Sequence, residues 1–206
     1  MSYQDGMAAL NLEMPSRVPR TEYSAAQHWE LVKKVTGIDV NAKSSEDIRQ
    51  AASNAFKKAW DYSFSWNVLV HVKELDQCRT QMGHAVFAAE GTDYSNQVFC
   101  PFEDVEEVLE FDPLQVYGTI NHSDQVDKFN ADYKKQCEMV PDAVNTTGIY
   151  ITLVSGLIEI FGWDMLLMAL GVDAEQFGKV ADRYTEWILQ YFKALADCDA
   201  PVVKIH

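Results

Sequence analysis

Short runs of β-branched and aromatic residues alternate with amphipathic helical segments along the chain, and this alternation most constrains the fold. The predicted strands are residues 17–23, 62–68, 143–147 and 201–206. The predicted helices between them are residues 25–37, 45–59, 123–140 and 173–196. A chain that alternates strand and helix forms a parallel sheet, because each helix returns the chain across that sheet. The sequence therefore predicts an α/β protein, with an antiparallel ribbon near 84–99 outside the alternation.

Small and polar residues mark the ends of the predicted helices. Gly37 is a predicted C-cap, and Ser44, with Asp47 three residues later, is a predicted N-cap. Residues 1–16 form a lead-in segment. Because we find no repeat, low-complexity tract or linker, we expect residues 1–206 to form a single domain.

Composition narrows the classes of partner. The net charge of -14 disfavours nucleic acid and anionic membranes, since both would repel the chain. The cysteines, Cys78, Cys100, Cys137 and Cys198, are widely spaced and form no CxxC pair. With no signal-peptide pattern at the start, they are expected to be reduced thiols of a cytoplasmic protein.

The apolar run at 149–172 is long enough to suggest a membrane span. It contains Glu159 and Asp164, each costing about 2.5 kcal/mol or more near the middle of a bilayer. Gly156 and Gly162 also interrupt it. We expect one or two buried helices of a soluble protein instead.

Candidate site residues are sought at the carboxyl ends of the predicted strands, where parallel α/β folds place functional groups. The candidates are Tyr23, Trp66, Asn67, Thr146 and His206. The two aromatic rings would form flat apolar walls for a substrate. Asn67 and His206 would supply hydrogen bonds or transfer protons, which makes them the candidate catalytic residues. Neighbouring strand residues face opposite ways, so Trp66 and Asn67 cannot both point inward unless one lies on a turn.

Each candidate also has a structural interpretation. Tyr23 and Trp66 are of a type more often found in cores than as substrate platforms. Thr146 can cap the following helix as readily as it can contact a substrate. His71, His84 and His122 have no ligand-like spacing, so no metal site is predicted from this chain alone.

Several stretches together resemble the uroporphyrinogen decarboxylase superfamily. They are RVPRTEYS, AWDYSFSWNVLVHVKEL, MGHAVFAAEG, TTGIYITLVSGLIEIFGWDMLLMAL and YFKALADCDAPVVKIH. The resemblance covers nearly the whole chain and implies a (β/α)8 barrel, of which this chain would supply about the first four βα units. The superfamily includes porphyrinogen decarboxylases and cobamide-dependent methyltransferases, which move methyl groups to or from a corrinoid protein.

Two departures from the family pattern bear on activity. Decarboxylases of the superfamily carry an arginine-containing stretch after the first strand, whereas TEYSAAQHWE has none. A polyanionic tetrapyrrole would match this acidic region poorly. The methyltransferase branch is the better fit, and by resemblance it uses zinc together with a corrinoid. Its zinc ligands belong to the second half of the barrel, and no stretch of this sequence matches them.

We therefore expect a corrinoid-dependent methyltransferase whose substrate is a small methyl donor or acceptor. A tetrapyrrole decarboxylase of the same superfamily is the runner-up. A non-catalytic half-barrel that binds a partner is the alternative from another class. A closed barrel needs about 250 residues and eight strands, so we also expect this chain to be an inactive fragment that associates through an open sheet edge.

Overall fold

The computed structural model describes residues 2–22, 24–81, 85–88, 91–94 and 99–205. Helices account for 59% of the structure and strands for 7%, so helix packing dominates both cores. The chain forms two compact units, each built from separate stretches of sequence. Unit 1 comprises Met1–Asn67, Ala131–Thr147 and Ala200–Val202, and unit 2 comprises Val68–Asn130, Gly148–Asp199 and Val203–His206. The single domain predicted for residues 1–206 stays a prediction.

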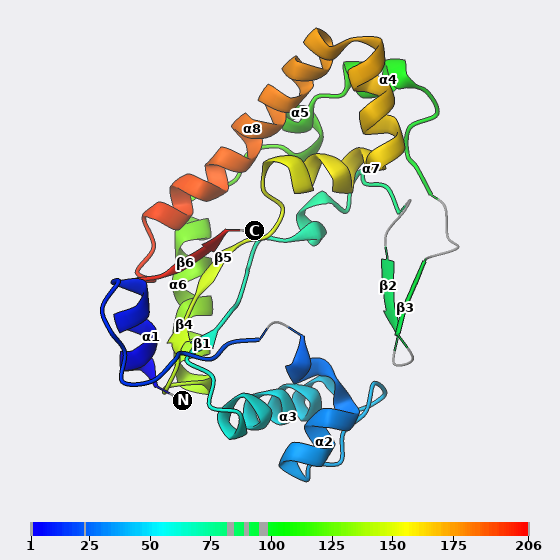
Figure 1. The fold of residues 1–206 in the computed structure, drawn as a ribbon. Coiled ribbons are helices and arrows are strands. Elements are labelled where there is room, and N and C mark those ends of the chain that lie inside the picture. Colours follow the sequence, from blue (N-terminus) through cyan, green and yellow to red (C-terminus); the bar gives the residue numbers. More distant parts are fainter. Residues whose placement is uncertain (1, 23, 82–84, 89–90, 95–98, 206) are drawn as a thin grey trace. The chain divides into compact units, whose positions relative to one another are not determined.

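Unit 1 holds the N-terminal helices (Figure 1). They are α1 (Tyr3–Leu10), η1 (Ala25–Gln27), α2 (Trp29–Thr36) and α3 (Glu46–Ala59), followed later in the chain by the second half of α6 (His122–Met139). Helices α2 and α3 pack against each other through a small apolar core centred on Val32, Phe56 and Tyr62. The sequence predicted these helices from their apolar spacing, and that prediction is confirmed.

The ends of α2 and α3 show how local signals set helix boundaries. Gly37 ends α2 in the left-handed region at φ 72°, as a C-cap glycine does, and its N–H donates to the Lys33 carbonyl. The N-cap of α3 is Ser45, whose hydroxyl accepts from the Ile48 N–H, so the prediction of Ser44 is wrong by one residue. The Ser44 hydroxyl instead accepts a hydrogen bond from the Asn41 N–H.

Two parallel pairings give unit 1 its sheet. Strand β1 (Phe64–Ser65) pairs in parallel with β4 (Val144–Asn145), and Arg20 forms a parallel bridge with Tyr62. The parallel direction agrees with the predicted alternation, but each strand is shorter than predicted. Around Arg20 the pairing is a single bridge, because Pro19 before it has no N–H to donate.

Unit 2 contains the longest helices (Figure 1). Its elements are η2 (Val72–Leu75), β2 (Ala85–Ala88), β3 (Gly91–Tyr94), α4 (Val105–Glu110), α5 (Pro113–Tyr117), α7 (Leu153–Val172), α8 (Ala174–Ala196) and β6 (Val203–Ile205). Strands β2 and β3 pair antiparallel, which confirms the predicted ribbon. The first half of α6 also belongs to this unit.

Strand β5 (Thr147–Ile149) pairs with β6, and Val70 forms a parallel bridge with Ile149. The predicted fourth strand is therefore present, over fewer residues than expected. Gly148 makes this pairing possible, since a Cβ there would lie 1.8 Å from the Lys204 carbonyl oxygen. The described residues form no closed barrel, and the barrel stays a prediction.

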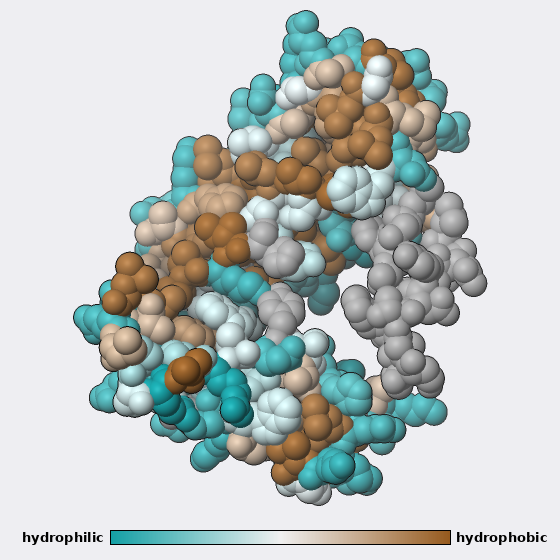
Figure 2. Space-filling view, viewed as in Figure 1, coloured by the Kyte–Doolittle hydropathy of each residue, from teal (hydrophilic) through white to brown (hydrophobic). Residues whose placement is uncertain are grey.

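Helix α7 is the apolar run that the sequence singled out. Its backbone turns sharply at Gly162, where φ is 72° and ψ is 169°, so the run forms two helical pieces. Among the described residues, it is the one helix long and apolar enough to cross a membrane, and 39% of its most apolar 18-residue window is buried. Its exposed apolar residues are Leu153, Val154, Trp163, Leu167, Met168, Leu170 and Val172. The run thus forms two helical pieces that are buried in part, where one or two buried helices were expected, and Figure 2 shows hydrophobic surface in this part of the molecule.

Helix α8 has the amphipathic face that the sequence predicted. The buried side chains on that face are Phe177, Val180, Tyr184, Trp187, Ile188, Tyr191, Ala194 and Leu195. Phe161 of α7 packs edge-on against Phe177, and Trp187 contacts both Tyr184 and Tyr191. Burial of these aromatic rings contributes to the apolar core of unit 2.

Asp5 of α1 joins this helix to the end of the lead-in segment and to Arg17 beyond it. Its carboxylate accepts hydrogen bonds from the Ser16 backbone N–H and hydroxyl, at 2.8 and 2.7 Å, and pairs with Arg17 at 3.2 Å. The bonds from Ser16 are the main reason that the pKa of Asp5 falls well below 3.8.

We expect Asp5→Asn to lower the melting temperature at neutral pH. A carboxyl group with a lowered pKa stabilises the fold above its unfolded-state pKa and loses that contribution as the pH falls through its folded-state pKa. The difference in melting temperature between the two proteins should therefore shrink below about pH 4. Thermal unfolding across pH 2–7 measures it, and a pH-independent difference would contradict this account.

Candidate functional site

Three of the predicted site residues lie just beyond the carboxyl ends of the parallel strands in unit 1. Trp66 and Asn67 follow β1, and Thr146 follows β4. The register pairs Phe64 with Val144 and Ser65 with Asn145, so both strands end at the same level. Because the strands are parallel, these residues meet at one edge, as the sequence predicted for this type of sheet.

Asn67 and Thr146 are in direct contact. The Asn67 backbone N–H donates to the Thr146 hydroxyl at 3.0 Å, and that hydroxyl lies 3.3 Å from the Asn67 carbonyl oxygen. Thr146 is fully buried. Helix α7 begins six residues later with Thr152 as its N-cap, so the interpretation of Thr146 as a helix cap is wrong. Its hydroxyl instead fixes the backbone of Asn67 at the end of the sheet.

The side chain of Asn67 is oriented by Asp132 of α6. Its Nδ2 donates to Asp132 Oδ2 at 2.6 Å, and both residues are partly buried. The amide Oδ1 is therefore the end of Asn67 that could accept a hydrogen bond from a ligand. Burial and a hydrogen bond with Cys137 raise the pKa of the adjacent Tyr133 to about 12, so its phenol is neutral near pH 7.

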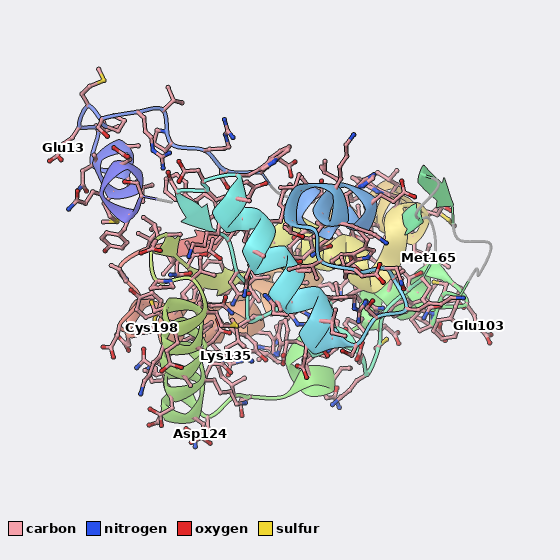
Figure 3. All side chains as sticks on the ribbon, turned by 90° about the horizontal axis from the view of Figure 1, so that it is seen from below. Glu13, Glu103, Asp124, Lys135, Met165 and Cys198 are labelled. Carbon is pink, nitrogen blue, oxygen red and sulfur yellow. The ribbon has the colours of Figure 1, made fainter. Side chains whose placement is uncertain are left out.

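Helix α6 has a second, charged side that faces solvent. Figure 3 labels Asp124 in its first turn and Lys135 in its second half, and both side chains are exposed. Asp132 differs from them because it turns toward the sheet and bonds to Asn67. Asp132 therefore belongs to the site, whereas those charged residues are ordinary surface groups.

Trp66 points in a different direction from Asn67. Its indole N–H donates to the Thr21 hydroxyl at 2.6 Å, and its ring stacks on Phe64 at 4.9 Å with planes 8° apart. Trp66 is partly exposed, so one face of the indole is supported by Phe64. The divergence follows from strand alternation, which forbids neighbouring residues from sharing a face.

The remaining candidates, Tyr23 and His206, lie outside the described residues, and their roles stay predictions. Thr21 and Asp132 were not among the predicted site residues. Thr21 lies within the predicted first strand. Asp132 is three residues after the buried Phe129, which places it beside the apolar face of α6, where an acidic residue is uncommon. That position was the available signal for Asp132.

A groove of about 460 Å³ lies in unit 2. Its lining residues are Thr152, Leu153, Val154, Ser155, Phe192 and Ile205. Leu153, Val154 and Ile205 are at least half exposed, so the groove is shallow and almost wholly apolar. Its two hydroxyl groups, on Thr152 and Ser155, lie 3.4 Å apart. The described residues that line the groove offer an apolar surface with two hydroxyl groups.

The described residues provide no metal centre. No group of three or more histidine, cysteine, aspartate or glutamate side chains among them is arranged to hold an ion. Zinc, which the family resemblance implies, therefore does not fit the residues in the described part of the chain.

Comparison of the chain with protein-family models finds no matching model, and comparisons with curated proteins and with solved structures find no match either.

Proposed function

We propose that this chain supplies the first four βα units of a (β/α)8 enzyme that transfers a methyl group to or from a corrinoid. The observation that carries the proposal is the edge of parallel strands at which Trp66, Asn67 and Thr146 gather. Trp66 offers a supported flat ring, and Asn67 offers an amide held by Asp132. These two side chains point in different directions, so the Trp66 ring would be the flat apolar surface for a small methylated substrate or the edge of a corrin ring, and Asn67 would be a separate hydrogen-bonding group at the same end of the strands.

The arginines near the first strand favour methyl transfer over decarboxylation of a tetrapyrrole. Arg17 pairs with Asp5 and Asp61, and Arg20 donates to the Trp60 carbonyl oxygen. Both guanidinium groups already have partners within unit 1. Binding several carboxylates of a tetrapyrrole would need cations free to make bidentate contacts. Decarboxylation therefore remains the second candidate.

The corrinoid would be carried by a partner protein and would supply the methyl-accepting metal centre. The residues of this chain would hold the organic substrate, with Asn67 as hydrogen-bonding group and Trp66, Thr146 and Tyr23 around it. His206 is the proposed proton-transferring group. The acidic net charge supports a protein that does not bind nucleic acid, and a cytoplasmic location is part of the proposal.

Binding of cobalamin tests the proposal. We expect methylcobalamin, followed by its absorbance spectrum during titration, to bind to the chain. Trp66→Leu should weaken binding about tenfold, because loss of one aromatic stacking contact is worth about 0.5–1.5 kcal/mol. Trp163→Leu is the matched control, since Trp163 is 54% exposed and belongs to unit 2.

Other outcomes would overturn the proposal in distinct ways. Tight binding of uroporphyrin in place of methylcobalamin would favour the decarboxylase. Binding of neither compound would contradict an enzyme of this superfamily and favour a partner-binding half-barrel. Equal loss of binding in the Trp66 and Trp163 variants would remove Trp66 from the site.

A further inference from the structure

A row of buried polar side chains lies along one face of the sheet in unit 1. Ser63 and Thr147 are 0% exposed, and Ser65 and Asn145 are 2% exposed. Residues two apart on a strand face the same way, and the register places Ser65 beside Asn145. The row therefore includes Ser65 at the end of β1 and Asn145 at the end of β4, with Ser63 just before β1 and Thr147 at the start of β5.

Three oxygen atoms in this row have no hydrogen-bond partner within the described part of the chain. They are Ser63 Oγ, Asn145 Oδ1 and Thr147 Oγ1. The amide of Asn145 is fixed, because its Nδ2 donates to the Val140 and Ala143 carbonyl oxygens at 2.8 and 3.1 Å. Its Oδ1 therefore cannot be satisfied by flipping the amide. A buried polar atom without a partner destabilises a fold by about 1–3 kcal/mol, so three in one row demand an explanation.

The row leads toward a partly exposed end. Asn67 lies two residues after Ser65, just beyond the end of β1, and its side chain bonds to Asp132. Both residues are partly exposed, so the row is fully buried at Ser63 and reaches the surface at the Asn67–Asp132 pair. Val140, which accepts from Asn145, follows α6, so the row faces the second half of that helix.

We propose that this row binds a string of internal water molecules between the sheet and α6. Water can donate to Asn145 Oδ1 and can both donate to and accept from the Ser63 and Thr147 hydroxyls. Sites of this kind, polar and lined by several unpaired groups, are where proteins hold ordered water. The inference concerns the sheet itself and does not depend on the proposed methyl transfer.

Two variants test whether water is bound to this row, because the melting temperature should fall if water is bound and rise if it is not. Ser63→Ala and Thr147→Val remove one hydroxyl each and nearly preserve shape. If water binds, both changes should lower the melting temperature by about 2–4 °C, because each removes about 1 kcal/mol of hydrogen bonding. If the row is dry, both should raise it, because an unpaired polar atom is lost. An unchanged or raised melting temperature in either variant would overturn the proposal.

Ser53→Ala gives the change in melting temperature for loss of a buried hydroxyl group that has a protein partner. The buried Ser53 hydroxyl donates to the Ala26 carbonyl oxygen at 2.6 Å within the same unit. Bound water can also be detected directly in the unaltered protein, so the test does not depend on a variant that folds. In the unaltered protein labelled at threonine methyl groups, long-lived water should give nuclear Overhauser contacts to the Thr147 methyl group. The absence of such contacts would contradict bound water.

Discussion

Gly148→Ala is expected to destabilise the protein by about 3 kcal/mol, since it inserts a methyl group where no side chain can move away. The Cβ would lie 1.8 Å from the Lys204 carbonyl oxygen and 2.6 and 2.9 Å from the carbonyl carbon and the nitrogen of the same residue. All three atoms are backbone, so relief requires β5 and β6 to separate. Chemical denaturation gives the free energy of unfolding, and amide hydrogen exchange around residues 203–205 shows whether the pairing is lost.

Gly178→Ala is the matched control. Gly178 lies on the exposed side of α8, and a Cβ there meets nothing within 4 Å. The control should stabilise the protein by about 1 kcal/mol, because alanine favours a helix over glycine. A Gly148→Ala protein as stable as the original would show that β6 does not approach β5 as closely as the structure has it.

Much of the secondary structure could be predicted because local patterns decide it. The buried face of α8 follows from apolar spacing over 23 residues, and Gly37 ends α2 as a C-cap glycine does. The meeting of Asn67 with Thr146 also followed, since parallel strands that end together bring their last residues to one edge. The barrel is a matter of how strands close over the whole molecule, and local patterns carry no direct signal for that.

Strand lengths could not be predicted, because polar side chains compete with backbone carbonyl groups for the backbone N–H groups that would extend a strand. The Thr146 hydroxyl takes the Asn67 N–H, where a backbone carbonyl would serve in a longer strand. The role of Asp132 depended equally on a contact between residues 65 apart in sequence. Such contacts are decided by packing and not by spacing along the chain.

The two glycines of α7 show the same limit, since both were expected to interrupt the apolar run. Gly162 does so, at φ 72°. Gly156 stays within the helix, and it is needed because the Tyr184 ring occupies the space beside it. The sequence does not distinguish the two glycines. The structure shows that Gly162 forms a bend, whereas Gly156 allows Tyr184 of α8 to approach the helix closely.

Gly156→Ala is accordingly expected to destabilise unit 2 by about 3 kcal/mol through Tyr184. The added Cβ would lie 1.7 Å from the Tyr184 hydroxyl oxygen and 2.3 Å from the ring carbon that bears it. The ring cannot turn aside freely, because Tyr184 is 0% exposed and its hydroxyl donates to the Ile151 carbonyl oxygen at 2.7 Å. Urea denaturation measures the change, and Gly171→Ala, where a Cβ meets nothing within 4 Å, is the control in the same helix.

A double-mutant cycle identifies the ring as the cause. Tyr184→Leu alone should cost about 3 kcal/mol, because it leaves a cavity and an unpaired carbonyl group. In the double variant the shorter leucine makes room for the new methyl group, which in turn fills part of the cavity. The two costs should therefore sum to more than the cost of the double variant by about 1 kcal/mol or more. Strictly additive costs would mean that Gly156 is required for a reason other than the Tyr184 ring.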